Sequence, residues 1–191
     1  AVAKKIGEKV IVISSSTGGT LSLILGNDPQ IAALLMFSPN IEIYDPRSKL
    51  LTLPWGLQIA QLVLGSKYHI MNKITEQKKN YWTTRYRLEP TVELQKLVET
   101  GMRPEIFKRI TAPVFMGYYY KNEEEQDKVV SIPAMLKMFD QLGTPAGKKQ
   151  KMAFPDAGDH VIASHLSSPN HQNVERAASL FLQNQFNVEL N

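Results

Sequence analysis

An apolar run, a tight polar turn and a second apolar run follow one another in KVIVISSSTGGTLSLILG, which spans Lys9 to Gly26. The β-branched residues Val10 to Ile13 predict a strand buried on both faces of a parallel sheet. Residues 14–19 are small and polar, so the strand ends there, and the apolar pattern that follows predicts a helix ending at Gly26. The order is therefore strand, very short turn, helix.

Ser16 occupies the middle of this turn. A turn of this kind places its central residue on a strained bend at the carboxyl end of the strand. It requires small residues two positions before and after, because the strand and helix backbones pass close together there, and Ser14 and Gly18 meet that requirement. The pattern is that of a nucleophile elbow with serine in place of the first glycine. The alternative is a Ser/Gly-rich loop or a phosphate-binding turn at a helix N-terminus. A P-loop is excluded, since no Gly-Lys-Ser/Thr follows the glycines.

The composition is that of a globular chain with one core, since 43% of its 191 residues are hydrophobic. The net charge of +4 is mild, and we expect the short lysine pairs at 4–5, 78–79 and 148–149 to be solvated, so nothing indicates nucleic-acid binding. The lack of cysteine excludes disulfides, thiolate catalysis and cysteine metal sites, but it leaves the compartment open. No apolar run reaches membrane-spanning length, and the first residues do not resemble a signal peptide.

Residues 1–7 (AVAKKIG) predict the last turns of a helix. The two lysines suit the negative end of a helix dipole, and Gly7 can provide the C-terminal cap. Because the chain also lacks an initiator methionine, we expect the natural protein to begin earlier, with this chain as its C-terminal part.

Two further apolar runs, residues 32–37 and 114–120, predict strands, and residues 150–154 predict a fourth strand. Helical patterns cover residues 129–142, with a proline in the first turn, and residues 173–186. Strands that alternate with helices predict a parallel sheet of about four strands with helices on both faces.

The segment between the second and third strands, residues 41–110, is far too long for an ordinary crossover. Two helices are predicted within it, one over residues 57–64 and one that opens at residues 89–91 and ends at Gly101. The segment also carries several aromatic residues: Trp55, Tyr68, Tyr81, Trp82 and Tyr86. An aromatic-rich helical insertion here predicts a lid over a substrate pocket, although the aromatics can equally fill the insertion's own core.

In a parallel α/β sheet, catalytic groups lie in the loops beyond the carboxyl ends of the strands. Three such loops offer Ser16, an acid and His160, in that order. Serine needs a base to take its proton, and the base needs an acid to hold its tautomer. His160 lies in the loop after the fourth strand, together with Gly158. His165 lies shortly after it, whereas His69 and His171 have no matching position after a strand.

The candidate acids are Glu123, Glu124, Glu125 and Asp127. We favour Asp127, because it precedes the predicted helix at residue 129, where the loop turns back towards the sheet. The alternative is that all four acids are solvated loop charges, which we expect of most of them.

Together these motifs resemble the C-terminal two-thirds of α/β-hydrolase-fold serine hydrolases of the esterase and lipase type. SSSTG stands where that family has Gly-x-Ser-x-Gly, APVFMGYYYKNEEEQDKVVSIP resembles its strand and acid loop, and FPDAGDHVIAS resembles its histidine loop. The resemblance implies a partial α/β-hydrolase fold, with residues 1–39 and 107–191 as core and residues 40–106 as a helical cap. It also implies that Ser16 is the nucleophile, His160 the base, Asp127 the orienting acid and the Thr17 backbone N–H one oxyanion donor.

The family's second oxyanion donor comes from a loop after an earlier strand, which this sequence does not contain. The strand at residues 10–13 would be central in the full sheet, so we expect it here as an unpaired apolar edge. The expected function is hydrolysis of a small-molecule carboxylic ester or related acyl compound through an acyl-enzyme, without cofactor or metal. Thioesterase, lactonase and peptidase activities stay open, as do the oligomeric state and a cytoplasmic or envelope location. The alternative function is a non-catalytic protein of this fold that binds a ligand or partner.

Overall fold

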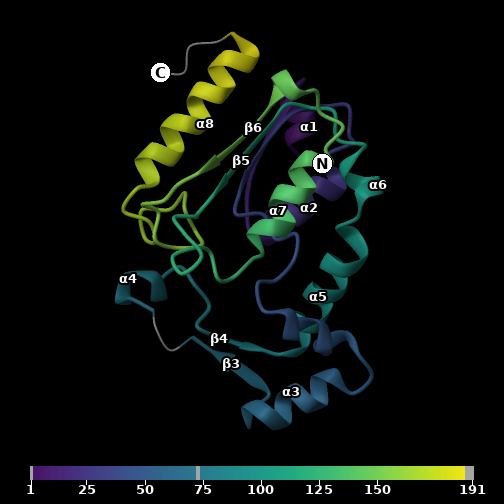
Figure 1. Ribbon diagram of the computed structural model, residues 1–191, viewed down its shortest axis with the longest axis vertical. Coiled ribbons are helices and arrows are strands. Elements are labelled where there is room, and N and C mark those ends of the chain that lie inside the picture. Colours follow the sequence, from purple (N-terminus) through teal and green to yellow (C-terminus); the bar gives the residue numbers. More distant parts are fainter. Residues whose placement is uncertain (1, 72–73, 188–191) are drawn as a thin grey trace.

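A parallel four-stranded sheet runs through the computed structural model, which describes residues 2–71 and 74–187 (Figure 1). The strands lie in the order β1-β2-β5-β6. Their bounds are β1 Val10–Ser15, β2 Ile31–Phe37, β5 Val114–Tyr118 and β6 Lys149–Ala153. The predicted parallel sheet of about four strands is therefore confirmed.

Helices cover both faces of this sheet, because successive residues of its apolar strands point to opposite sides. In β2, Leu34 and Met36 pack towards α2 (Thr17–Leu25), α6 (Pro104–Phe107) and α7 (Ile132–Asp140). Ala33, Leu35 and Phe37 pack towards α8 (His171–Phe186) on the other side (Figure 1). In the described residues, no helix has the length and apolar character needed to cross a membrane.

The strand β1 lies at the edge of the sheet, as expected of this chain, but it is not buried on both faces. Ile11 and Ile13 are 42% and 67% exposed, because within the described residues β1 pairs only with β2. A groove of about 340 Å³ beside it is lined by Ile13, Leu35 and Leu182 among others. The two-sided burial predicted for residues 10–13 is thus wrong for the chain as it stands.

The start of one helix and the surroundings of one lysine pair differ from their predictions. Helix α7 begins at Ile132 rather than residue 129, with Ser131 as its cap. The lysine pair at 148–149 is not simply solvated, because the Lys149 ammonium donates to the Phe139 carbonyl at 3.0 Å near the end of α7. Helix α1 (Ala3–Ile6) is present, and Gly7 caps it as predicted, because its N–H donates to the Ala3 carbonyl at 3.0 Å from an extended backbone with φ −130°. Residue 1 lies outside the described residues.

The insertion between β2 and β5 contains the two predicted helices and several elements that were not predicted. Its elements are η1 (Pro46–Thr52), α3 (Gly56–Leu64), β3 (Tyr68–Ile70), α4 (Glu76–Lys79), β4 (Arg85–Arg87), α5 (Glu89–Gly101) and α6. The antiparallel pair β3–β4 has only three residues in each strand. Figure 1 shows α3, β3 and β4 beyond the carboxyl ends of the sheet strands. That residues 40–106 form a cap over a substrate pocket stays a prediction.

Candidate active site

Ser16 joins β1 to α2 in a conformation that is rare for a residue with a side chain. Its φ is +52° and its ψ is −122°. Backbone hydrogen bonds hold it there: its N–H donates to the Phe37 carbonyl at 3.0 Å. Its own carbonyl accepts from the N–H groups of Gly19 and Asn40 at 2.9 and 3.0 Å. Ser16 is therefore presented on a strained bend at the carboxyl end of the strand.

Small residues allow the strand and helix to approach on either side of Ser16. A Cβ on Gly18 would lie 3.4 Å from Cβ of Ser14, which is ordinary contact. A Cβ on Gly19 would lie only 2.5 Å from Cβ of Pro39, so this position accepts glycine alone. The spacing around Ser16 pointed to Ser14 and Gly18. The same spacing gave no reason to single out Gly19, because its close neighbour, Pro39, follows β2 rather than β1.

Asp127 lies in the loop after β5 and is only 1% exposed. Its Oδ1 accepts hydrogen bonds from the backbone N–H groups of Val129 and Val130, at 2.8 and 3.2 Å. Its Oδ2 lies 2.6 Å from Nδ1 of His160. The predicted helix start at residue 129 is wrong, so the residues after Asp127 turn around its carboxylate instead of extending a helix. That turn fixes the carboxylate from one side while His160 meets it from the other.

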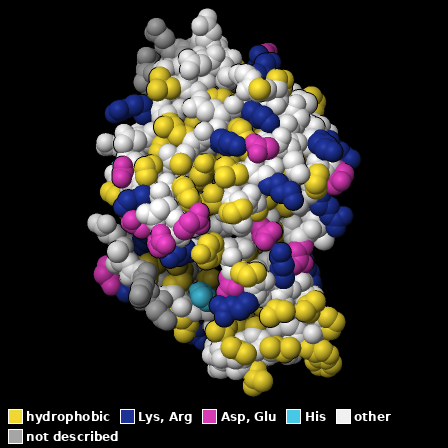
Figure 2. Space-filling view, viewed as in Figure 1, with side chains coloured by type: hydrophobic (Ala, Val, Ile, Leu, Met, Phe, Trp, Pro, Cys, Tyr) yellow, Lys and Arg dark blue, Asp and Glu magenta, His cyan; other side chains and the backbone are white. Residues whose placement is uncertain are grey.

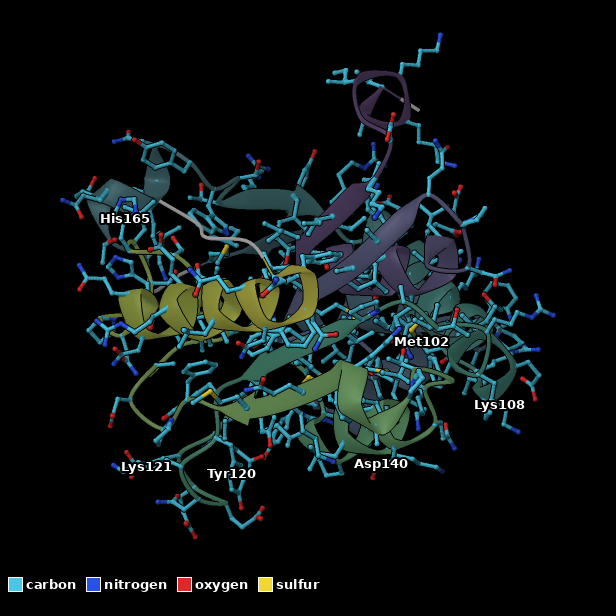
Figure 3. All side chains as sticks on the ribbon, turned by 90° about the horizontal axis from the view of Figure 1, so that it is seen from above. Met102, Lys108, Tyr120, Lys121, Asp140 and His165 are labelled. Atoms are coloured by element: carbon cyan, nitrogen blue, oxygen red, sulfur yellow. The ribbon has the colours of Figure 1, made fainter. Side chains whose placement is uncertain are left out.

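The three neighbouring glutamates lie on an exposed loop. Glu125 pairs with Lys121 at 2.9 Å, and the hydrogen bond from this lysine holds the pKa of the Glu125 carboxyl below its usual value. Glu123 accepts a hydrogen bond from the Tyr120 hydroxyl at 3.0 Å. Figure 3 shows Tyr120 and Lys121 on a loop at the margin of the molecule. Of the candidate acids, only Asp127 is buried against a histidine.

His160 is oriented by this contact. A carboxylate only accepts hydrogen bonds, so Nδ1 carries the proton shared with Asp127, and Nε2 is left with a free lone pair. Among the described residues, the buried Nε2 has no hydrogen-bond partner, Ser16 included. The structure thus brings Asp127 and His160 together, and it leaves Ser16 outside hydrogen-bond reach of His160.

The other three histidines have different surroundings. His165 and His171 lie edge to face, with ring centroids 6.1 Å apart, and His69 lies against the Tyr86 ring at 5.0 Å. Across the described chain, no group of three or more acidic or histidine side chains is placed to hold a metal ion.

Thr17 is the first residue of α2, so its backbone N–H has no acceptor within the helix and can bind an anion near Ser16. The segment after β2 supports this end of the helix. The Thr20 hydroxyl donates to the Asn40 carbonyl at 2.6 Å, and Asn40 itself is 4% exposed. The sequence carries no signal for this bracing role, because the contact joins two different strand ends.

An ion pair joins the insertion to the histidine loop. The Lys78 ammonium in α4 lies 3.0 Å from Oδ2 of Asp159, the residue before His160, and the two side chains are only 20% and 30% exposed. Oδ1 of the same carboxylate accepts from the Val161 N–H at 2.9 Å. The prediction that Lys78 is simply solvated is therefore wrong.

No protein-family model and no curated protein matches the sequence. Solved structures do. The chain is similar to a Paleococcus ferrophilus monoacylglycerol lipase at 14% identity and a TM-score of 0.67, over 96% of this chain and 72% of the other. It is similar to one of the metagenome-derived lipolytic enzymes LipS and LipT at 11% identity and a TM-score of 0.68, over 94% of this chain and 67% of the other. It is similar to a monoglyceride lipase from Saccharomyces cerevisiae at 15% identity and a TM-score of 0.61, over 91% of this chain and 64% of the other.

At these identities the likeness is one of fold, and it extends over almost all of this chain but only part of each neighbour. The parallel four-stranded sheet with helices on both faces is the part of the architecture that carries this likeness. The chain therefore has a partial α/β-hydrolase fold, spanning 64–72% of the length of the three lipolytic enzymes named above.

Proposed function

We propose that this chain carries the catalytic groups of a serine hydrolase that cleaves carboxylic esters or related acyl compounds. Ser16 is the nucleophile, His160 the base and Asp127 the acid that orients it. One observation carries the proposal: a buried carboxylate lies 2.6 Å from Nδ1 of a histidine whose Nε2 has no partner among the described residues. The lipases and esterases among the structural neighbours support an ester substrate.

The first half of the reaction forms an acyl-enzyme. Ser16 Oγ attacks the substrate carbonyl carbon while its proton passes to Nε2 of His160. The carbonyl oxygen becomes an oxyanion, to which the Thr17 N–H donates a hydrogen bond. Collapse of this tetrahedral intermediate breaks the bond to the alcohol oxygen, which takes the proton from Nε2. The acyl group is left as an ester on Ser16.

The second half repeats these steps with water. His160 Nε2 removes a proton from a water molecule as its oxygen attacks the acyl-enzyme carbonyl, and the proton then returns to Ser16 Oγ as the acid leaves. In both halves, Asp127 stabilises the imidazolium that forms. Its charge is fixed by the N–H groups of Val129 and Val130, so little reorganisation is needed when the proton arrives.

Catalysis requires Ser16 Oγ to reach Nε2, and hydrogen bonds of this kind are often long or poorly aligned until substrate binds. A second oxyanion donor is also expected from sequence outside this chain, which spans only part of its structural neighbours. Loss of one such donor typically costs on the order of a hundred- to a thousandfold in rate.

Labelling with a fluorophosphonate probe tests the nucleophile, because such probes react with activated serines. We expect one label on Ser16 by peptide mapping, and its loss in Ser16→Ala. Ser15→Ala is the matched control and should still be labelled, since Ser15 belongs to β1 and precedes the strained bend. A label on Ser15, or no label on a folded protein, contradicts the assignment. Ligand binding without any labelling would favour the non-catalytic alternative.

A further inference from the structure

The positive charge of the chain is concentrated in the part of the insertion that contains β3, α4 and β4. Residues 66–88 carry six lysines and arginines and one acidic residue, a net charge of +5, whereas the net charge of the whole chain is +4. Figure 1 shows β3 and β4 at one end of the molecule, away from the main sheet. Figure 2 shows lysine or arginine side chains near the place where Figure 1 draws β4. This end of the molecule is therefore electrostatically suited to an acidic partner.

Arg85 in β4 is available to bind an acidic group from outside the chain. Three other cations are already paired with acidic residues of the chain: Lys78 with Asp159, Lys79 with Glu76 and Arg87 with Glu89. Arg85 is exposed and forms no ion pair with any residue that the structure describes. Its guanidinium lies 4.0 Å from the centre of the Tyr68 ring. Stacking of this kind holds the planar group in place and leaves its N–H groups able to bind a carboxylate.

The backbone of β4 offers a second kind of binding group along the edge that faces away from β3. In an antiparallel pair, every second residue of a strand directs its N–H and C=O groups to the partner strand. The Leu88 N–H donates to the Lys67 carbonyl at 3.0 Å, so Leu88 and, two positions before it, Tyr86 face β3. Arg85 and Arg87 occupy the alternate positions, and their backbone groups point to the opposite edge. In the described residues β4 pairs with β3 alone, and all three residues of β4 are exposed.

From these features we propose that β4 binds an extended acidic peptide segment of a partner protein as an added β-strand. The outward N–H and C=O groups of Arg85 and Arg87 hydrogen-bond the main chain of that segment. The two arginine side chains lie on one face of β4, because they are two residues apart, so acidic side chains at alternate positions of the segment face them. The acidic side chain opposite Arg85 contributes most, since Arg87 already has Glu89 as its partner. The proposal does not depend on the hydrolase assignment.

The same arginines disfavour other occupants of this edge. Two copies of β4 paired with each other would set arginine against arginine, and like charges directly opposite one another are destabilising. Short edge strands with charged side chains also resist pairing with neutral segments. A nucleic acid can use the cations, but it has no peptide main chain to pair with the backbone groups of Arg85 and Arg87. An acidic peptide uses both the charge and the edge.

Amide exchange measured by NMR tests strand addition directly. The probe is a synthetic peptide with blocked ends, Thr-Val-Glu-Val-Glu-Val-Thr, and the control peptide has lysine in place of both glutamates. With a saturating amount of the acidic peptide, we expect the amide hydrogens of Arg85 and Arg87 in the full-length protein to exchange at least about tenfold more slowly. The amide hydrogen of Tyr86 should change little, because it already faces β3. Binding of the peptide should weaken as salt is added.

Variants separate the contributions of charge and backbone. Arg85→Gln should weaken peptide binding by about fivefold, the upper end of what one cross-strand charge pair contributes. Arg87→Gln should have a smaller effect. Arg87→Pro also removes an outward N–H that the β3–β4 pair does not use, and it should weaken binding by more than about tenfold. The matched control is Lys96→Gln on α5, outside the charged segment, which should bind the peptide as the unmodified protein does. Circular dichroism should show an unchanged fold in each variant.

Several results would overturn the proposal. One is no slowing of exchange with either peptide, and another is equal slowing with both. A third is binding of the acidic peptide that leaves the amides of Arg85 and Arg87 unprotected, which means side-chain contact without strand addition. Protection of these amides before peptide is added would mean that a second copy or another part of the chain covers the edge. Tighter binding of a short oligothymidine than of the acidic peptide would make a nucleic acid the occupant. Ser16→Ala should bind the peptide as the unmodified protein does, so failure of this proposal and failure of the hydrolase assignment remain distinguishable.

Discussion

At the residue scale, the two carboxylate oxygens of Asp127 have different hydrogen-bond partners. Oδ1 accepts from the N–H groups of Val129 and Val130, and Oδ2 meets His160. In Asp127→Asn, the amide oxygen can keep the turn, while the amide N–H donates to Nδ1 and moves the histidine proton to Nε2. We expect an intact fold and a loss on the order of ten-thousandfold in kcat for ester hydrolysis.

Glu125→Gln is the matched control, because Glu125 makes its contacts on the exposed loop and its change should alter kcat little. Near-normal turnover in Asp127→Asn, together with collapse in a variant of Glu123, Glu124 or Glu125, would show that the acid is misassigned.

Sequence order predicted the loops that carry Ser16, Asp127 and His160, and the structure brings the last two into contact. Their catalytic roles stay predictions. The turn that fixes Asp127 was not predicted, since it depends on backbone N–H groups that any sequence provides. The Lys78–Asp159 ion pair was also not predictable from the sequence, because the two residues are 81 positions apart.

At the element scale, the contact of α2 with the segment after β2 depends on Gly19. A Cβ there would lie 2.5 Å from Cβ and 2.8 Å from Cα of Pro39, and neither atom belongs to a flexible side-chain end. Gly19→Ala should therefore lower the free energy of unfolding by about 1–3 kcal/mol. Urea titration measures this as a lower midpoint. Gly147→Ala is the control, since nothing lies within 4 Å of its Cβ position, and equal midpoints for both variants would contradict the argument.

The strands β1, β2 and β5 were predictable because each is mainly a run of apolar residues between turn signals. The start of α7 was missed for a specific reason. A helix from residue 129 would place Pro133 at its fifth position, where a backbone N–H is needed, whereas from Ile132 the proline falls in the first turn. The β3–β4 pair escaped prediction because its strands are only three residues long and include Arg85, Arg87 and His69.

At the scale of the whole molecule, topology decides burial in ways that local sequence does not show. The residues of β1 have the composition of a central strand, yet Ile13 is 67% exposed because β1 is the edge of this sheet. The insertion likewise touches the core at points far apart in sequence. Its first residues pair with the segment after Asp127 through the Ile43–Val130 bridge, and α4 reaches the loop of His160.

The Lys78–Asp159 ion pair offers a test of this second attachment. Partly exposed pairs contribute up to about 1 kcal/mol, which corresponds to roughly a fivefold change in a local opening equilibrium. In Lys78→Met, we expect amide hydrogens of residues 79–82 to exchange up to about fivefold faster, with little change in global stability. The matched control is Lys79→Met, because the Lys79 ammonium pairs with Glu76 inside α4 and does not tie the insertion to the core.

If residues 40–106 cap the site, Lys78→Met should also change the ratio of kcat/KM between long and short acyl esters, and Lys79→Met should not. Reversing both charges, with Lys78→Asp and Asp159→Lys, should restore slow exchange. Equal exchange in the two single variants would show that the pair does not hold the insertion in place.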